Sequence, residues 1–211
     1  MVAAPRKTPA RAKPGESVRL SRDDWLDAAF DAVVEGGFDA VRVLTLAQRL
    51  GVTRGSFYWH FADHAELVQA LLARWHAREL ASDQVLQGSI SGDASSDLEV
   101  LLDAALAHAG ADLENMRFEL ALRGLGRRDA EVARMLAAVD QMRVRQGQQR
   151  FQRLTGDEKT AAELASLFYL AIVGSHQALS RPGNPPRLKE YLRGVIARYL
   201  IQHQIPVSNP R

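Results

Sequence analysis

The sequence contains no cysteine, and this absence excludes several kinds of site. Without thiols the chain forms neither disulfides nor thiolate metal centres, and a cytoplasmic location is the natural expectation. No apolar run approaches the roughly 20 residues that span a bilayer, and the N-terminus lacks the apolar core of a signal peptide. We therefore expect no membrane contact.

Motifs that carry catalysis are also missing. There is no phosphate-cradling glycine loop, no HExxH pair and no nucleophile elbow. Six histidines are present, but only His60 and His64 are four residues apart, and a helix boundary expected at Asp63 separates them. We therefore expect a protein that is not an enzyme, with no catalytic residues, no metal site and no cofactor.

An excess of charge of one sign is lacking as well. The 27 Lys and Arg residues against 25 Asp and Glu residues leave a net charge of +2, so the total does not argue for nucleic acid. Within residues 1–20, however, basic residues outnumber the single acidic Glu16, and three prolines and a glycine oppose a helix. We interpret residues 1–20 as a flexible basic arm, which either contacts DNA phosphates or the minor groove or is a solvated terminus.

Helical periodicity begins abruptly at Ser21. Ser21 and Asp24 form a pattern like a capping box, and Gly36-Gly37 predicts the end of this helix. A stretch rich in Gly, Ser and Asp from Gln87 to Ser96 predicts a loop and a domain joint. Nothing in the sequence predicts a strand, and further helices are expected at about 97–110, 113–126, 129–154, 158–180 and 186–203.

The most informative segment runs from Leu44 to Leu67, with the sequence LTLAQRLGVTRGSFYWHFADHAEL. Its pattern predicts a short helix, a tight turn at Gly51, a second short helix and the start of a third. Thr53 and Asp63 stand where they can cap the two later helices. This arrangement is one that proteins use to insert a helix end into the major groove of DNA.

The segment resembles the DNA-binding domain of the TetR family of transcriptional regulators, specifically at LAQRLGV (46–52) and FYWHF (57–61). The resemblance implies an all-α fold with an N-terminal three-helix helix-turn-helix DNA-binding domain and a C-terminal helical ligand-binding and dimerisation domain. We expect the first domain at 21–67, a connecting helix at about 63–80 and the second domain at 81–211.

The resemblance also implies which residues contact DNA. The reading helix would be about Arg54–His60, with Arg54 reading a base edge or, alternatively, holding a phosphate. Tyr58 and His60 would contact phosphates, and Trp59 would pack on the sugar-phosphate edge or on a neighbouring helix. The predicted DNA-contacting residues are Arg42, Thr53, Arg54, Gly55, Ser56, Tyr58, Trp59, His60 and His64.

Two of these positions depart from the family pattern. Arg42 stands where Ser or Thr commonly caps the second helix, so the cap is weaker but a cation lies beside the DNA backbone. His64 stands where Lys is usual, and an imidazolium adds charge that a neutral imidazole lacks. We therefore expect DNA binding to weaken as the pH rises through the titration of His64, with His64→Gln as the comparison.

The resemblance further implies that the last two helices form a four-helix bundle with a second copy, and two successive apolar faces agree with this. Such a homodimer would present two reading helices to a palindromic operator. The predicted interface residues are Leu164, Leu167, Phe168, Ala171, Ile172, Ser175, Leu188, Tyr191, Leu192, Val195, Ile196 and Tyr199.

An inducer pocket between the middle helices and the fourth would complete the family pattern. The predicted lining residues are Trp75, Leu102, Leu106, His108, Phe118, Leu122, Tyr169 and His176. Charged residues such as Arg123 and Glu119, and the polar run from Met142 to Arg150, are expected on the solvated surface. A ligand would act by population shift, lowering operator affinity by favouring badly spaced reading helices.

These observations predict a ligand-responsive DNA-binding regulator, most simply a repressor that a small-molecule inducer releases from DNA. A helix-turn-helix protein that acts through a protein partner without an inducer is the alternative. The sequence does not give the operator, the regulated genes or the effector.

Overall fold

The computed structural model describes residues 20–110, 113–178, 190–191 and 193–198, and these residues form helices without any strand. The all-α prediction is therefore confirmed for the described chain. Residues 190–191 and 193–198 are helical too. The named helices, with one 3-10 turn (η1), are α1 (Arg22–Gly36), η1 (Phe38–Ala40), α2 (Val43–Arg49), α3 (Arg54–Phe57), α4 (His64–Gly88), α5 (Ala94–Gly110), α6 (Leu113–Gly126), α7 (Ala130–Thr155) and α8 (Glu158–Ala178).

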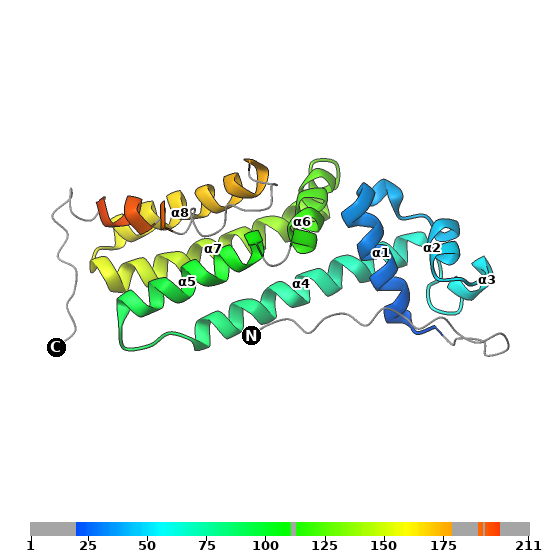
Figure 1. The fold of residues 1–211 in the computed structure, drawn as a ribbon, viewed down its shortest axis with the longest axis horizontal. Helices are drawn as coiled ribbons and strands as arrows, with labels where there is room; N and C mark the ends of the chain where they lie inside the picture. The colour runs from blue at the N-terminus through cyan, green and yellow to red at the C-terminus, as the bar shows by residue number, and fades with distance from the viewer. Residues whose placement is uncertain (1–19, 111–112, 179–189, 192, 199–211) are drawn as a thin grey trace.

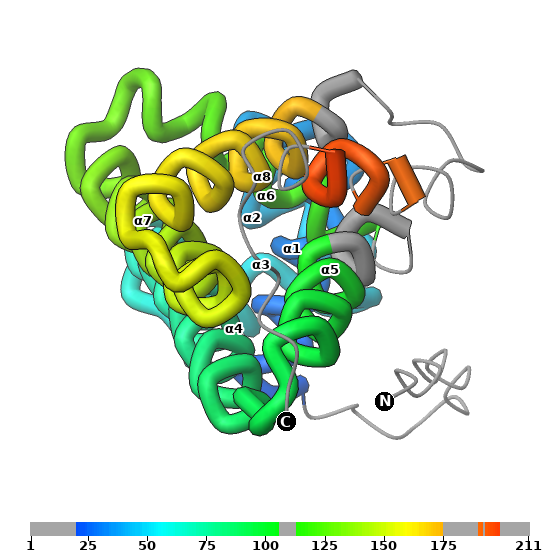
Figure 2. The backbone as a smooth tube through the Cα atoms, turned by 90° about the vertical axis from the view of Figure 1, so that its left-hand side faces the viewer, coloured from blue at the N-terminus to red at the C-terminus, as the bar shows by residue number. Residues whose placement is uncertain are grey.

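The described helices form an elongated molecule with a small head at one end (Figure 1). Helices α1, α2 and α3 make the head, and α4 runs from the head along the length of the body. Seen end-on, α4, α5, α8 and α7 surround a common axis (Figure 2). The helices α7 and α8 approach each other closely at Gly147, where an added Cβ would lie 3.4 Å from the Cβ of Ala165.

The ends of α1 follow from local sequence. The Ser21 hydroxyl accepts a hydrogen bond from the amide of Asp24 at 3.2 Å, and the Asp24 carboxylate accepts one from the amide of Ser21 at 2.7 Å. This is the capping box that the sequence predicts. Gly37 has a φ of 75°, which glycine tolerates and which ends the helix as predicted.

Three helix boundaries differ from the predictions. The helix α4 extends to Gly88 instead of residue 80, and α5 begins at Ala94 instead of residue 97. Asp93 explains the earlier start, because its carboxylate accepts hydrogen bonds from the amides of Ser95 and Ser96 at 3.4 and 2.9 Å. The helix α3 ends at Phe57 instead of His60, and the chain continues as a turn.

A reciprocal cap holds the start of α4. The Asp63 carboxylate accepts from the amide of Glu66 at 2.9 Å, and the Glu66 carboxylate accepts from the amide of Ala62 at 2.7 Å. The prediction that Asp63 caps this helix is therefore confirmed.

Replacing Asp63 with alanine is expected to lower the free energy of unfolding by about 1 kcal/mol, because the amide of Glu66 loses its acceptor. Asp63→Asn keeps an oxygen at the same place and is expected to stay within a few tenths of a kcal/mol of the parent, as urea denaturation would measure. Equal losses in the two variants would contradict the capping role.

The core of the head continues into the body without a break. Trp25, Phe57 and Phe61 are buried in the same cluster as Phe118 of α6 and Val139 of α7. Phe118 is the joint between the two parts. Its ring stacks on Phe30 of α1 with centroids 5.0 Å apart, and it meets the edge of Phe38 at 5.7 Å.

Candidate nucleic-acid interface

The segment Arg54–His60 alternates between buried anchors and exposed side chains. Phe57 is fully buried and Phe61, just beyond the segment, is 2% exposed, whereas Tyr58 is 51% and Trp59 88% exposed. Exposed apolar side chains that gather in one place commonly mark a binding surface, and Tyr58 and Trp59 are adjacent in the chain. The segment is therefore built to present side chains outward while its own anchors hold it in place.

The anchors are aromatic and pack edge-on or stacked. The Phe57 ring meets the edge of Trp25 with centroids 5.3 Å apart and stacks on Phe61 at 5.4 Å. Arg22 lies over the outer ring, with its guanidinium carbon 4.6 Å from the Phe61 centroid. These contacts fix the backbone of the segment, so the exposed side chains start from a rigid base.

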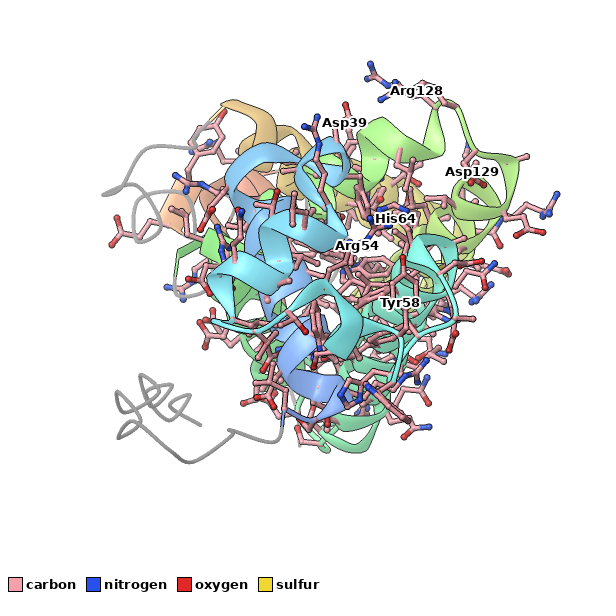
Figure 3. The ribbon with its side chains drawn as sticks, turned by 90° about the vertical axis from the view of Figure 1, so that its right-hand side faces the viewer. Asp39, Arg54, Tyr58, His64, Arg128 and Asp129 are labelled. Atoms are coloured by element: carbon pink, nitrogen blue, oxygen red, sulfur yellow. The ribbon has the colours of Figure 1, made fainter. Side chains whose placement is uncertain are left out.

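Arg54 and Tyr58 stand one helical turn apart at the tip of the head (Figure 3). A terminal nitrogen of Arg54 donates a hydrogen bond to the Tyr58 hydroxyl at 3.0 Å, and both side chains are exposed. Tyr58 thereby orients the guanidinium while leaving its other donors pointing to solvent. A guanidinium oriented in this way can bond two acceptors on a guanine edge at once.

Arg42 and Thr53 occupy the N-caps of α2 and α3, but neither side chain caps its helix. The prediction that the Thr53 hydroxyl caps α3 is therefore wrong. The absence of a cap on α2 agrees with the expectation for Arg42, whose Nε donates to the Asp39 carbonyl at 3.3 Å. Both N-cap residues are exposed.

The remaining small and polar residues of the segment differ in exposure. Gly55 is exposed, whereas Ser56 and His60 are half-buried. A Cβ added to Gly55 would meet only Thr53 Oγ1, at 3.7 Å, so the site itself tolerates a side chain. The reason for glycine there would lie in what approaches from outside, which stays a prediction.

His64 is tied to the scaffold. Its Nε2 lies 2.7 Å from the carbonyl oxygen of Val41, the residue that leads into α2. This hydrogen bond joins the start of α4 to the loop before α2. A direct phosphate contact by His64, and the pH dependence drawn from it, stay predictions.

Residues 26–71, which cover α1 to the first part of α4, match the family model described as bacterial regulatory proteins, tetR family. Several curated transcriptional regulators also match part of the chain. Residues 26–71 thus carry the domain of the tetR family of bacterial regulatory proteins.

Relatives of known name support this assignment. The chain is 32% identical over 109 residues to the tetracycline repressor protein class D of Escherichia coli, covering 48% of this chain and 50% of that protein. It is 41% identical over 61 residues to the transcriptional regulator TtgR of Pseudomonas putida, covering 29% of each. The chain thus spans about half the length of the first of these TetR relatives.

Solved structures extend the likeness to the whole fold. A transcriptional regulator from Rhodococcus sp. Rha1 has a TM-score of 0.68 and 19% identity, over 87% of this chain and 97% of that one. A transcriptional regulator from Saccharomonospora viridis, solved in complex with choline, has a TM-score of 0.67 and 18% identity, over 89% and 98%. These neighbours and the TetR relatives are named as regulators and not as enzymes, in agreement with the expectation from sequence.

No described helix is long and apolar enough to cross a membrane. No group of three His, Cys, Asp or Glu side chains in the described part of the chain could hold a metal ion.

The body contains a cavity, but most of the predicted lining residues lie elsewhere. The cavity has a volume of about 130 Å³, and residues of helices α4 to α8 line it. Tyr169 lines it as predicted. Trp75, Phe118 and Leu122 instead fill the core shared with the head. Leu102 belongs to a second core, which α5, α7 and α8 form within the body. The side chains of Leu106, His108 and His176 lie outside the described residues.

Charged side chains at the cavity are the residues that sequence reasoning missed. Arg143 of α7 donates to Glu119 of α6 at 2.9 and 3.0 Å and to Glu79 of α4 at 2.8 Å. Arg123 bonds the same Glu119 at 2.7 Å and Asp140 at 2.8 Å. The expectation that Arg123 and Glu119 lie on a solvated surface is therefore wrong, because the network packs between helices.

The pKa values of two groups in this network lie far from neutral pH. Burial alone would raise the pKa of Glu119, but hydrogen bonds and attraction from Arg143, and then from Arg123, outweigh it and lower the pKa to about 2. Burial and contact with Asp140 raise the pKa of Tyr169 to about 12. At neutral pH the network therefore contains a carboxylate at Glu119 and an uncharged phenol at Tyr169.

The polar run from Met142 to Arg150 is also less exposed than predicted. Arg150 is fully buried and Gln146 is 4% exposed. Arg150 donates to the Gln146 side chain at 2.6 Å and also to the carbonyl of Leu86. This contact ties α7 to the end of α4, and the prediction of a wholly exposed run is wrong.

Some of the residues predicted to form the dimer interface are buried within the chain, and others are exposed. Leu164, Phe168, Ile172 and Ile196 are buried in the chain's own second core, and Ala171 packs against that core, which leaves these residues little surface for the predicted dimer interface. Leu167, Tyr191 and Val195 are exposed, at 57%, 64% and 39%. Sequence periodicity missed Leu170, which is 64% exposed. Leu188, Leu192, Tyr199 and the side chain of Ser175 lie outside the described residues.

Proposed function

We propose that this TetR-family regulator binds a palindromic operator as a homodimer and represses transcription until a small molecule releases it from DNA. The observation that carries the proposal is that Arg54, Tyr58 and Trp59 are exposed on a buried aromatic base. In this proposal Arg54 reads a base, and Tyr58 and His60 hold phosphates. The division into a reading domain at 21–67 and an effector and dimerisation domain at 81–211 belongs to the same proposal.

The test uses the DNA that flanks the reading frame. Purified protein is expected to protect an inverted repeat whose half-sites lie about one DNA turn apart, roughly 34–36 Å. Random DNA of equal length is the comparison, at physiological salt, because phosphate contacts alone bind any sequence. Equal affinity for the two duplexes, or protection of a single half-site by a monomer, would contradict the proposal.

The exposed leucines of α8 support pairing with a second copy. Leu167 and Leu170 lie three residues apart on the helix and leave more than half of each side chain in water. Residues three apart share a helix face, and burial of a leucine contributes about 1.5–3 kcal/mol. A symmetric pair of such faces would bury four leucines.

The double variant Leu167→Glu, Leu170→Glu is expected to be monomeric at concentrations where the parent sediments as a dimer, because charge would be buried in the interface. Val85→Glu is the matched control, since Val85 is 75% exposed on α4 and away from this face. Analytical ultracentrifugation separates the two outcomes. A dimer that persists in the double variant would place the interface elsewhere.

The cavity supports the ligand-responsive part of the proposal. It lies between the long helices of the body, and α6 carries both Glu119 at the cavity and Phe118 against the head. A ligand that moves α6 would therefore move the packing of α1. The structural neighbour from Saccharomonospora viridis was solved with choline, which supports the proposal that this fold accepts a small molecule.

A further inference from the structure

The cavity in the body has a charged side and an apolar side. Of the residues that line it, three carboxylates stand against a single guanidinium: Glu79, Asp83, Glu119 and Arg143. The opposite wall is aliphatic and aromatic, with Leu86, Leu101, Phe168 and Ile172 among its residues. A cavity of this kind selects a ligand by shape along the apolar wall and by charge along the other.

The charge around the cavity stays negative when the neighbouring charged side chains are also counted. Arg143 is shared between Glu79 and Glu119, and Arg123 binds Glu119 and Asp140 from behind the cavity. With the buried Arg150 also included, four carboxylates face three guanidinium groups around the cavity. Because charges act strongly where water is excluded, this residual negative charge favours a positive ligand.

Asp83 is the carboxylate best placed to receive that ligand. Its two oxygens accept hydrogen bonds from the side-chain amides of Gln146 and Gln87, each at 2.7 Å. Gln146 in turn accepts from Arg150, which keeps the amide hydrogens directed at Asp83. The hydrogen bonds to Asp83 come from neutral amides, whereas arginines bind Glu79 and Glu119 directly. Arg150 attracts Asp83 only through space.

The aromatic residues fit the same ligand. Phe168 and Tyr169 line the cavity from α8, and the face of an aromatic ring attracts an organic cation. Tyr169 stays an uncharged phenol, so it adds no competing charge. The apolar wall would cover the hydrophobic part of the ligand.

We infer that the cavity binds a hydrophobic organic cation, with its positive group against Asp83 and Glu79 and its apolar body against Leu86, Phe168 and Ile172. The inference names the effector class for the proposed regulator and rests on that proposal. It concerns the cavity alone, so it can fail while the DNA-binding proposal stands.

Three probes of matched shape test the charge preference on the full chain. Phenyltrimethylammonium is cationic, tert-butylbenzene is its neutral counterpart, and benzenesulfonate is anionic. Calorimetric titration is expected to give a dissociation constant for the cation at least tenfold lower than for either of the others, as a single favourable charge contact would produce. Equal affinities, a preference for benzenesulfonate, or no binding of any probe would overturn the inference.

Variants locate the charge. Asp83→Asn is expected to weaken binding of phenyltrimethylammonium about tenfold and to leave tert-butylbenzene unchanged. Glu131→Gln removes an equal charge from an exposed site on α7 and is expected to change neither. Loss of both ligands in Asp83→Asn with an unchanged melting temperature, or loss of neither, would overturn the role of Asp83.

Operator binding by the same samples separates this inference from the proposed function. A chain that binds the inverted repeat but prefers benzenesulfonate overturns the cation and keeps the regulator. A chain that binds the cation but no specific DNA supports the cavity assignment and overturns the regulator.

Discussion

Replacing Arg54 with alanine is expected to lower affinity for the palindromic operator about 10- to 100-fold, since a two-point contact to guanine is worth about 1–3 kcal/mol. The loss of affinity should mainly concern sequence-specific binding to the operator. Affinity for random DNA should fall much less, so the ratio between the two duplexes should shrink. Competition binding at one fixed salt concentration measures both affinities.

Two controls make the result interpretable. Arg74→Ala removes the same charge from α4, where Arg74 binds Asp27 at 2.8 Å away from the reading segment, and should leave the ratio unchanged. Tyr58→Phe removes the hydroxyl that Arg54 bonds at 3.0 Å and should reproduce part of the loss. If Arg54→Ala weakens both duplexes equally, Arg54 contacts a phosphate and not a base.

Replacing Glu119 with glutamine is expected to lower the free energy of unfolding at pH 7 by about 3 kcal/mol, because two guanidinium groups would lose their shared carboxylate. The side chain of Glu119 is only 9% exposed, and Arg143 and Arg123 both bind it. Glu131→Gln is the matched control. Its ion pair with Arg134 is exposed and 3.9 Å long, so it should change stability by less than about 0.5 kcal/mol.

The pH dependence gives the same residue a second test. The pKa of Glu119 is about 2 in the folded chain against 4.5 as the ordinary value. A lowered pKa contributes stability that is complete above pH 4.5 and is lost as the pH falls toward 2. Urea titrations should therefore show the gap between parent and Glu119→Gln constant from pH 7 to 5 and narrowing below. A gap that widens on acidification would contradict the assignment.

The head could be predicted from sequence because its signals are local. The capping pair of Ser21 and Asp24, the stop at Gly37 and the cap at Asp63 each depend on residues within four positions. The alternation of buried Phe57 and Phe61 with exposed Tyr58 and Trp59 also follows from residue type and spacing. The prediction that Thr53 caps α3 was wrong because a cap requires a side-chain geometry that residue type alone does not determine.

The body could be predicted only as a set of helices. The packing surface of α7 determines which face of α8 is buried. Helical periodicity alone therefore did not separate buried Phe168 from exposed Leu167. Burial of Glu119, Arg143 and Arg150 depends on partners up to 64 residues away in the chain. A polar run predicts a solvated surface until its distant partners are known.

The stack of Phe118 on Phe30 has a consequence for dissecting this molecule. A fragment that ends at Gly88 would keep the whole reading segment but would strip α6 from α1 and leave Phe30 and Phe38 facing water. Such a fragment is expected to aggregate or to have a melting temperature far below that of the intact chain. Limited proteolysis of the intact chain is expected to release no folded head early in the digestion. Experiments that borrow this head for another body would need to supply a replacement for Phe118.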